Sequence, residues 1–192
     1  MSDPNAFDLL RAALESAGIR YAVGGSWAST AFGEPRSTND VDVLADVTQN
    51  NLPTLLSHLP DSFYADLQEA LSALRRGRPF NLIHMSSALK FDIFPAGAFP
   101  IGREELDRAL LLEDTGLSRE ATWFVTPEDI LLAKLHWFKL GGEVSEVQWR
   151  DIMGLVRGRA ETLDHEYLDR ASLQLGVREL LHRSIVEAAF LP

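Results

Sequence analysis

The chain has 192 residues, 46% of them hydrophobic, which suits one compact domain or a domain with a helical extension. Its net charge of −10 and isoelectric point of 4.9 argue against non-specific nucleic-acid binding, which needs clustered basic residues. Because the chain has no cysteine, disulfides and thiolate metal sites are excluded.

The front half of the chain alternates between helical and extended patterns. Apolar residues recur at helical spacing over 5–17, which predicts an amphipathic helix that ends at Gly18. The segment 103–112 fits a helix and a strand equally well. Further helices are predicted at 26–31, 48–59 and 66–76, and strands at 19–23, 40–45, 79–85, 89–94 and 122–125.

From residue 126 onward the pattern is helical only. A helix is predicted to begin after the cap residue Thr126, with Pro127 at its first position, and further helices follow it. We therefore predict an α/β domain over 1–125, built from a small mixed sheet flanked by helices, and a helical C-terminal subdomain over 126–192.

A glycine turn follows the first predicted strand. Gly24, Gly25 and Ser26 lie between that strand and a short helix. Glycine lets the backbone approach a ligand closely, and the free amides at the start of the helix point toward it. Ser26 is either an ordinary helix cap, or a cap that also donates a hydrogen bond to a phosphate oxygen.

Two carboxylates, Asp40 and Asp42, lie two residues apart on the predicted strand 40–45. Side chains at this spacing point the same way, about 6.6 Å apart along the strand, so their charges repel unless something neutralises them. A hard cation such as Mg²⁺ takes carboxylate and phosphate oxygens together. The pair predicts a site for a metal–nucleotide complex; the alternative is that both are ordinary turn and strand-end residues.

A third carboxylate, Asp92, lies on the predicted strand 89–94 and shares a face with Lys90. If the two acidic strands are neighbours, three carboxylates converge on one patch, as is needed to hold one or two Mg²⁺ ions against a triphosphate. Asp92 would ligate metal or accept the proton of an acceptor hydroxyl as general base. The alternative is a structural salt bridge to Lys90 or Arg36.

These residues together resemble the nucleotidyltransferase superfamily, whose fold is shared with DNA polymerase beta. Within it the chain is most similar to the AbiEii-type toxins and the small antibiotic nucleotidyltransferases. The resemblance extends into the helical half, where 127–134 and 148–152 are similar to the AbiEii-like group. The residues that carry it in the front half are Gly24, Gly25, Ser26, Arg36, Thr38, Asp40, Asp42 and Asp92.

The resemblance implies a role for each of these side chains. Asp40, Asp42 and Asp92 would be catalytic and would hold the metal. Gly24, Gly25, Ser26, Arg36 and Lys134 would bind the nucleotide.

Two of the nucleotide-binding assignments have open alternatives. Arg36 suits a bidentate grip on phosphate or a clamp on Asp42, or it is simply exposed. Lys134 is near the nucleotide phosphates in the related toxins, but a lysine on a half-covered helix face also snorkels to solvent. Asp151 either orients Lys134 or only forms a salt bridge. The tryptophans at 123, 137 and 149 are expected in the core rather than as stacking platforms for bases.

The function predicted on this basis is transfer of a nucleoside monophosphate from an NTP, with Mg²⁺ or Mn²⁺, to a hydroxyl or phosphate acceptor on tRNA, protein or a small molecule. The alternative is a non-catalytic nucleotide- or partner-binding module, such as a toxin–antitoxin component with an antitoxin partner. With no signal-peptide pattern at its start and no run of ~18 apolar residues, a cytoplasmic protein without membrane contact is expected.

Overall fold

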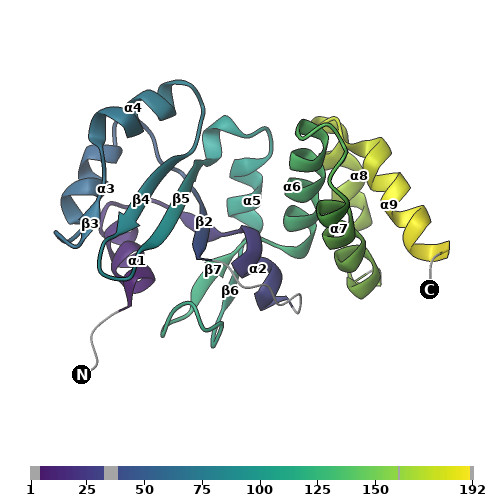
Figure 1. Ribbon diagram of the computed structural model, residues 1–192, viewed down its shortest axis with the longest axis horizontal. Helices are drawn as coiled ribbons and strands as arrows, with labels where there is room; N and C mark the ends of the chain where they lie inside the picture. Colours follow the sequence, from purple (N-terminus) through teal and green to yellow (C-terminus); the bar gives the residue numbers. More distant parts are fainter. Residues whose placement is uncertain (1–4, 33–38, 160, 191–192) are drawn as a thin grey trace.

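The computed structural model of the protein describes residues 5–32, 39–159 and 161–190, and within them the α/β class predicted from the sequence is confirmed (Figure 1). The strands are β1 (Tyr21–Val23), β2 (Asp40–Ala45), β3 (Phe63–Tyr64), β4 (Phe80–His84), β5 (Leu89–Pro95), β6 (Leu110–Leu112) and β7 (Thr122–Phe124). The helices are α1 (Ala6–Ser16), α2 (Gly25–Ala31), α3 (Leu52–His58), α4 (Leu67–Arg75), the 3₁₀ turn η1 (Ala96–Ala98), α5 (Gly102–Arg108), α6 (Pro127–Leu140), α7 (Glu146–Arg159), α8 (His165–Gln174) and α9 (Arg178–Phe190).

The strands form one mixed sheet in the order β3-β4-β5-β2-β1-β7-β6. The central pair, β2 and β5, is parallel, while β4 and β5 form the antiparallel hairpin that the sequence predicts. Successive side chains of a strand point to opposite faces, and Val41, Val43, Phe91 and Ile93 are fully buried on one face. The acidic residues of β2 and β5 therefore lie on the other face.

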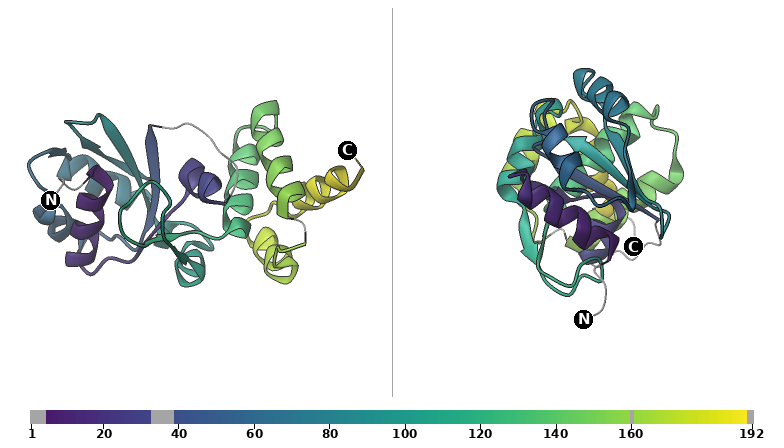
Figure 2. Two further views of the ribbon diagram at one scale, coloured as in Figure 1. Left: turned by 90° about the horizontal axis from the view of Figure 1, so that it is seen from below. Right: turned by 90° about the vertical axis from the view of Figure 1, so that its left-hand side faces the viewer.

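The two faces of the sheet are covered by different helices (Figures 1 and 2). The face that carries Val41 and Phe91 packs against α1, whose Phe7 ring lies 6.4 Å from the Phe91 ring, and against α3 and α4. The opposite face is turned toward α5 and the helical C-terminal half, and α2 lies between β2 and α6 (Figure 2).

Buried apolar side chains form two clusters, one around the sheet and one within the C-terminal helices. The helix α6 contributes to both: its Ile130 packs with the sheet cluster, and Leu131, Leu132 and Leu135 pack with the helical one. Thr126 caps this helix as predicted, because its hydroxyl accepts a hydrogen bond from the backbone amide of Asp129. The division at 125/126 stays a prediction, since α6 belongs to both clusters.

One local prediction was wrong, and two features were left open by the sequence. The helix expected from residue 48 begins at Leu52, because Thr48 and Asn51 bond each other in a turn that precedes it. The ambiguous segment 103–112 contains both a helix, α5, and a strand, β6. The strand β3 was not predicted, because two residues are too few to show a period. None of the helices in the described ranges is long and apolar enough to cross a membrane.

Candidate active site

Asp42 and Asp92 lie directly opposite each other on adjacent strands. The register of the parallel pair β2 and β5 aligns Asp42 with Asp92 and Asp40 with Lys90. All four side chains are therefore on the face that is turned away from the sheet core, as strand periodicity predicts. Asp40 starts β2 and its side chain is about half exposed, whereas the side chain of Asp92 is 20% exposed.

Lys90 lies between two of the three carboxylates. Its Nζ is 3.0 Å from Asp92 Oδ2 and 3.4 Å from Asp40 Oδ2. The salt bridge that the sequence offered as the alternative for Asp92 is therefore present, and it includes Asp40 as well. Among residues 5–32, 39–159 and 161–190, no three His, Cys, Asp or Glu side chains are grouped so that they could hold a metal ion, so the predicted convergence of three carboxylates is not preformed.

The electrostatics of Asp42 nevertheless favour a bound cation. Burial raises the pKa of Asp42 to about 6, and repulsion from Asp92 and Asp40 adds to the increase, while Lys90 and Lys134 oppose it. A carboxylate that is desolvated and next to like charges is relieved when a cation binds. Asp42 and Asp92 therefore fit a divalent ion whose remaining ligands come from phosphate or water.

The glycine turn before α2 is built around Asp42. The Gly24 amide donates to the backbone oxygen of Asp42 at 2.9 Å, which fastens the turn to β2. Gly25 has φ +56°, and a Cβ added there would lie 1.7 Å from Asp42 Oδ2. Only glycine satisfies both conditions, because it tolerates positive φ and leaves room for the carboxylate. Ser26, expected as the helix cap, instead lies half-buried within the first turn of α2, whose cap residue is Gly24 without a side-chain hydrogen bond.

Lys134 approaches the same site from the helical half. It lies on α6, its side chain is 21% exposed, and its Nζ is 3.3 Å from Asp151 Oδ2 on α7. The ammonium group is thus held in an ion pair at the cleft rather than extended into solvent. Arg36, the remaining residue of the predicted nucleotide-binding set, lies outside the described residues, as does Thr38, which was quoted only for the resemblance.

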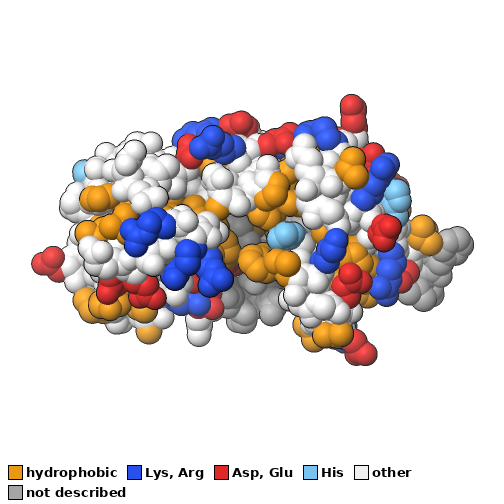
Figure 3. Space-filling model, turned by 90° about the horizontal axis from the view of Figure 1, so that it is seen from above, with side chains coloured by type: hydrophobic (Ala, Val, Ile, Leu, Met, Phe, Trp, Pro, Cys, Tyr) orange, Lys and Arg blue, Asp and Glu red, His pale blue; other side chains and the backbone are white. Residues whose placement is uncertain are grey.

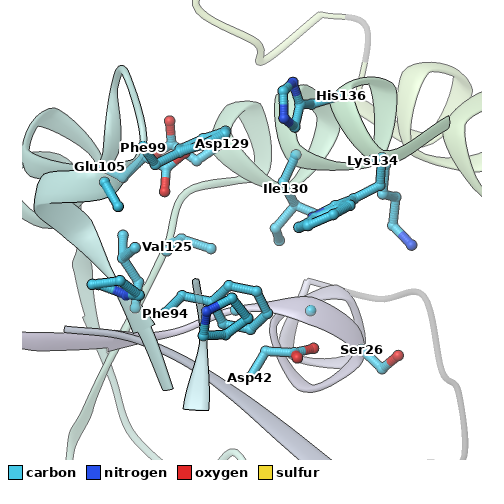
Figure 4. Close-up of a pocket in the computed structure, with 18 of the residues that line it drawn as sticks. Ser26, Asp42, Phe94, Phe99, Glu105, Val125, Asp129, Ile130, Lys134 and His136 are labelled. Carbon is cyan, nitrogen blue, oxygen red and sulfur yellow. The ribbon is translucent and has the colours of Figure 1, made fainter. Parts of the chain in front are cut away.

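A cavity of about 540 Å³ joins these groups and extends beyond them. It lies between the sheet and the helices α5 and α6, and Figure 3 shows the hollow with apolar side chains and a histidine at its rim. One end includes Asp42 and Ser26; the other includes the ring of Phe99 together with two buried acids, Glu105 and Asp129 (Figure 4). Of the predicted site residues, Gly24, Gly25, Ser26, Asp42 and Lys134 line this cavity, whereas Asp40 and Asp92 flank Asp42 outside its lining.

Three residues of the cavity wall were missed or misread from the sequence. Trp137, expected in the core, is 49% exposed and lines the cavity. Glu105 and Asp129 are 5% and 1% exposed and lie at the end far from Ser26 (Figure 4). Asp129 carried a helix-start signal only, and Glu105 falls in the segment whose structure was ambiguous, so neither gave a signal for a pocket.

Comparison with solved structures identifies the fold. An antigenic nucleotidyltransferase-like protein from Paracoccidioides brasiliensis matches with a TM-score of 0.50 and 20% identity, over 95% of this chain and 94% of the other. The chain has a nucleotidyltransferase-like fold. The antibiotic-resistance factor ANT(2'')-Ia also matches, with a TM-score of 0.46 and 16% identity, over 95% of this chain and 92% of the other. No protein-family model matches the sequence, and no curated protein sequence is significantly similar to it.

The nucleotidyltransferase-like fold is the fold that the resemblance implied, and placement within the AbiEii-type group stays a prediction. At this level of identity the likeness shows the fold alone, so the activity has to be argued from the site itself.

Proposed function

We propose that this protein is a Mg²⁺-dependent nucleotidyltransferase, which moves a nucleoside monophosphate from an NTP to a hydroxyl or phosphate acceptor. The observation that carries the proposal is the placement of Asp42 directly opposite Asp92 and against Gly25, at the mouth of a cavity that also contains Lys134. Two carboxylates for a cation and a lysine for phosphate are the groups that nucleotidyl transfer needs.

Each group has a distinct task in binding the NTP. Asp42 and Asp92 would hold the divalent ion, and Lys134 would place its positive charge on the phosphates. Ser26 and the backbone of Gly25 would line the phosphate side of the cavity. When bound, Mg²⁺ supplies positive charge that neutralises phosphate oxygens, and Mn²⁺ would serve in the same place.

The transfer step uses Asp92 on the acceptor side. An acceptor oxygen forms a bond to the α-phosphorus, the bond from that phosphorus to the oxygen bridging to the β-phosphate breaks, and pyrophosphate leaves. With a hydroxyl acceptor, the proton passes to the carboxylate of Asp92. Lys90, 3.0 Å from Asp92, keeps that carboxylate oriented.

The test is a transfer assay with labelled nucleotides. Each of the four NTPs, labelled on the α-phosphate, is incubated with the protein, Mg²⁺ and separate pools of RNA, protein and small molecules. We expect protein-dependent label in one pool, together with pyrophosphate release, and its loss in Asp42→Asn. Nucleotide binding without transfer into any pool would contradict the catalytic proposal.

A second candidate is a non-catalytic nucleotide-binding module with the same fold. The observation in its favour is the position of Lys90, which already neutralises Asp40 and Asp92 without a metal ion. In that case Mg²⁺ would add little to nucleotide affinity, because the lysine would serve as the permanent counter-ion. Calorimetric titration of ATP with and without Mg²⁺ separates the two, since the enzyme requires the metal for tight binding.

A further inference from the structure

Glu105 has no task in the proposed phosphate chemistry, and it lies in the wall of the same cavity. It is 5% exposed, and its Oε1 has no hydrogen-bond partner in the part of the chain that the structure describes. Its neighbour Asp129 is satisfied, because it accepts hydrogen bonds from the hydroxyls of Thr126, at 2.7 Å, and Tyr167. A buried polar atom without a partner costs free energy, which points to a partner that enters with a ligand.

The groups around Glu105 keep it neutral at pH 7. Burial raises the pKa of Glu105 to about 8, and repulsion from Asp129 on α6 adds to the increase. The other charged or titratable groups close by are Tyr167 on α8 and Arg108, whose guanidinium stacks over the Tyr167 ring at 3.7 Å. A neutral carboxyl offers one hydrogen-bond donor and one acceptor side by side.

A row of aromatic rings runs along the cavity, from Phe94 on the Asp42 side to Phe99 at the end that holds Glu105 (Figure 4). The rings of Phe94 and Trp137 are 6.4 Å apart, those of Trp137 and His136 5.8 Å, and those of His136 and Phe99 5.2 Å, so the four form a continuous row. All four line the cavity, and burial lowers the pKa of His136, which is therefore neutral. Neighbouring rings of the row meet edge to face, at interplanar angles of 66°, 72° and 74°, so each ring offers a separate face on which a base can stack.

The cavity is thus asymmetric in the same sense as a nucleotide. Its polar end, with Ser26 and Lys134, suits phosphate, and its far end combines the ring of Phe99 with the carboxyl of Glu105 (Figure 4). We propose that the far end is the nucleobase subsite, in which Glu105 binds the amino-substituted edge of adenine or cytosine in preference to the carbonyl edge of hypoxanthine or uracil. This inference rests on the proposed NTP-dependent function.

The preference for an amino edge follows from the charge of this end. The carboxyl of Glu105 donates to the ring nitrogen and accepts from the amino group beside it. A carbonyl edge would instead bring an oxygen close to Asp129, whose two oxygens already accept hydrogen bonds from hydroxyls and offer no donor to a carbonyl. Lys134 lines the cavity on the phosphate side, and Arg108, the cation close to this end, acts on Asp129 by lowering its pKa.

The test compares nucleotides that differ only at this edge. Calorimetry with Mg²⁺ and no acceptor measures the dissociation constants of ATP against ITP and of CTP against UTP. We expect the amino nucleotide of each pair to bind roughly tenfold more tightly, which is the usual scale for a good bidentate contact to a base. Above about pH 8 the affinity for ATP should fall, because ionised Glu105 then faces the lone pair of the ring nitrogen.

Three variants assign the preference to Glu105. Glu105→Leu should abolish it and raise the melting temperature, since an unpaired buried acid is removed. Glu105→Gln keeps a donor and an acceptor, so it should retain tight ATP binding and lose the decline above pH 8. The matched control is Glu104→Leu on the same helix, because Glu104 pairs with Arg170 at the surface and should leave the preference unchanged.

The outcomes separate this inference from the proposed function. Equal binding within both nucleotide pairs, or a preference that persists in Glu105→Leu, would overturn the base subsite and leave nucleotidyl transfer standing. Failure of all four nucleotides to bind with Mg²⁺ would overturn both. A third outcome is that spermidine binds tightly only when Glu105 is present, while Glu105→Leu leaves the affinity for ATP unchanged. That result would assign this end of the cavity to a cationic ligand and would also overturn the base subsite.

Discussion

Replacing Gly25 by alanine should separate folding from site geometry. At φ +56° an alanine pays the left-handed backbone cost of about 1–2 kcal/mol, which lowers the melting temperature of a chain of this length by roughly 2–8 °C. The added Cβ would lie 1.7 Å from Asp42 Oδ2, and 3.0 Å is the closest approach that real Cβ atoms show. The oxygen must therefore move by at least 3.0 − 1.7 = 1.3 Å.

The chain contains a control for the backbone part of this effect. Gly18, which follows α1, has φ +66° and no atom within 4 Å of an added Cβ. Gly18→Ala should introduce the same backbone strain, and its new methyl group should contact no residue of the site. Both variants should thus be destabilised by similar amounts, because the Asp42 side chain can rotate away from the new methyl group at little cost to stability.

The two variants should differ in their response to Mg²⁺ and ATP. A nucleotide at 100 times its dissociation constant stabilises the native state by about 2.7 kcal/mol, or roughly 5–11 °C for a chain of this length. Gly18→Ala should keep this shift. A misplacement of more than 1 Å commonly weakens a site about 100-fold, which would leave about 0.4 kcal/mol in Gly25→Ala. Equal Mg²⁺–ATP shifts in both variants would refute the proposed role of Gly25 in positioning Asp42.

Three further predictions concern the charged side chains. Folding raises the pKa of Asp42 from 3.8 to about 6, so the protonated carboxyl stabilises the metal-free protein below about pH 4, and this stabilisation is lost as the pH rises through 6. Chemical denaturation at several pH values should show no such loss in Asp42→Asn. Mg²⁺ should also raise the stability of this variant less than that of the wild type. Asp92→Asn removes a proposed metal ligand and the proposed base together, so it should reduce transfer by about two orders of magnitude or more in the labelled-nucleotide assay, and full activity would exclude Asp92 from both roles. Lys90→Gln removes the positive charge that is paired with Asp40 and Asp92. Added Mg²⁺ should therefore raise the melting temperature of this variant more than that of the wild type. A smaller rise in the variant would mean that Lys90 helps to organise the metal site.

The carboxylate face of the sheet could be predicted because strand periodicity is a local property. Asp42 and Asp92 alternate along their strands with buried neighbours such as Val41 and Phe91. This alternation places both acids on the face of the sheet opposite the buried residues, in whatever order the strands are arranged. The register that aligns the two acids depends on how the strands pair, and the position of Lys90 between Asp40 and Asp92 follows from that register. The sequence raised Lys90 only as a partner of Asp92.

The apolar half of the cavity could not be predicted, because it arises only when distant elements meet. Glu105 on an amphipathic helix carries the pattern of a solvated surface residue, and its burial depends on α6 packing across it. Trp137 belongs to a mostly apolar helix, in which the spacing of apolar residues does not distinguish a position in the core from one in a cavity wall. Tertiary placement, rather than local propensity, decides both residues.

The position of α6 in both hydrophobic clusters has a consequence for cooperativity. One continuous helix carries Ile130 into the sheet cluster and Leu131 into the helical cluster, and on its cavity side it carries Lys134. A melted C-terminal half would therefore remove the phosphate-binding lysine and one wall of the cavity at the same time. Partial unfolding should abolish nucleotide affinity entirely, so that bound ligand ties both clusters into a single unfolding transition.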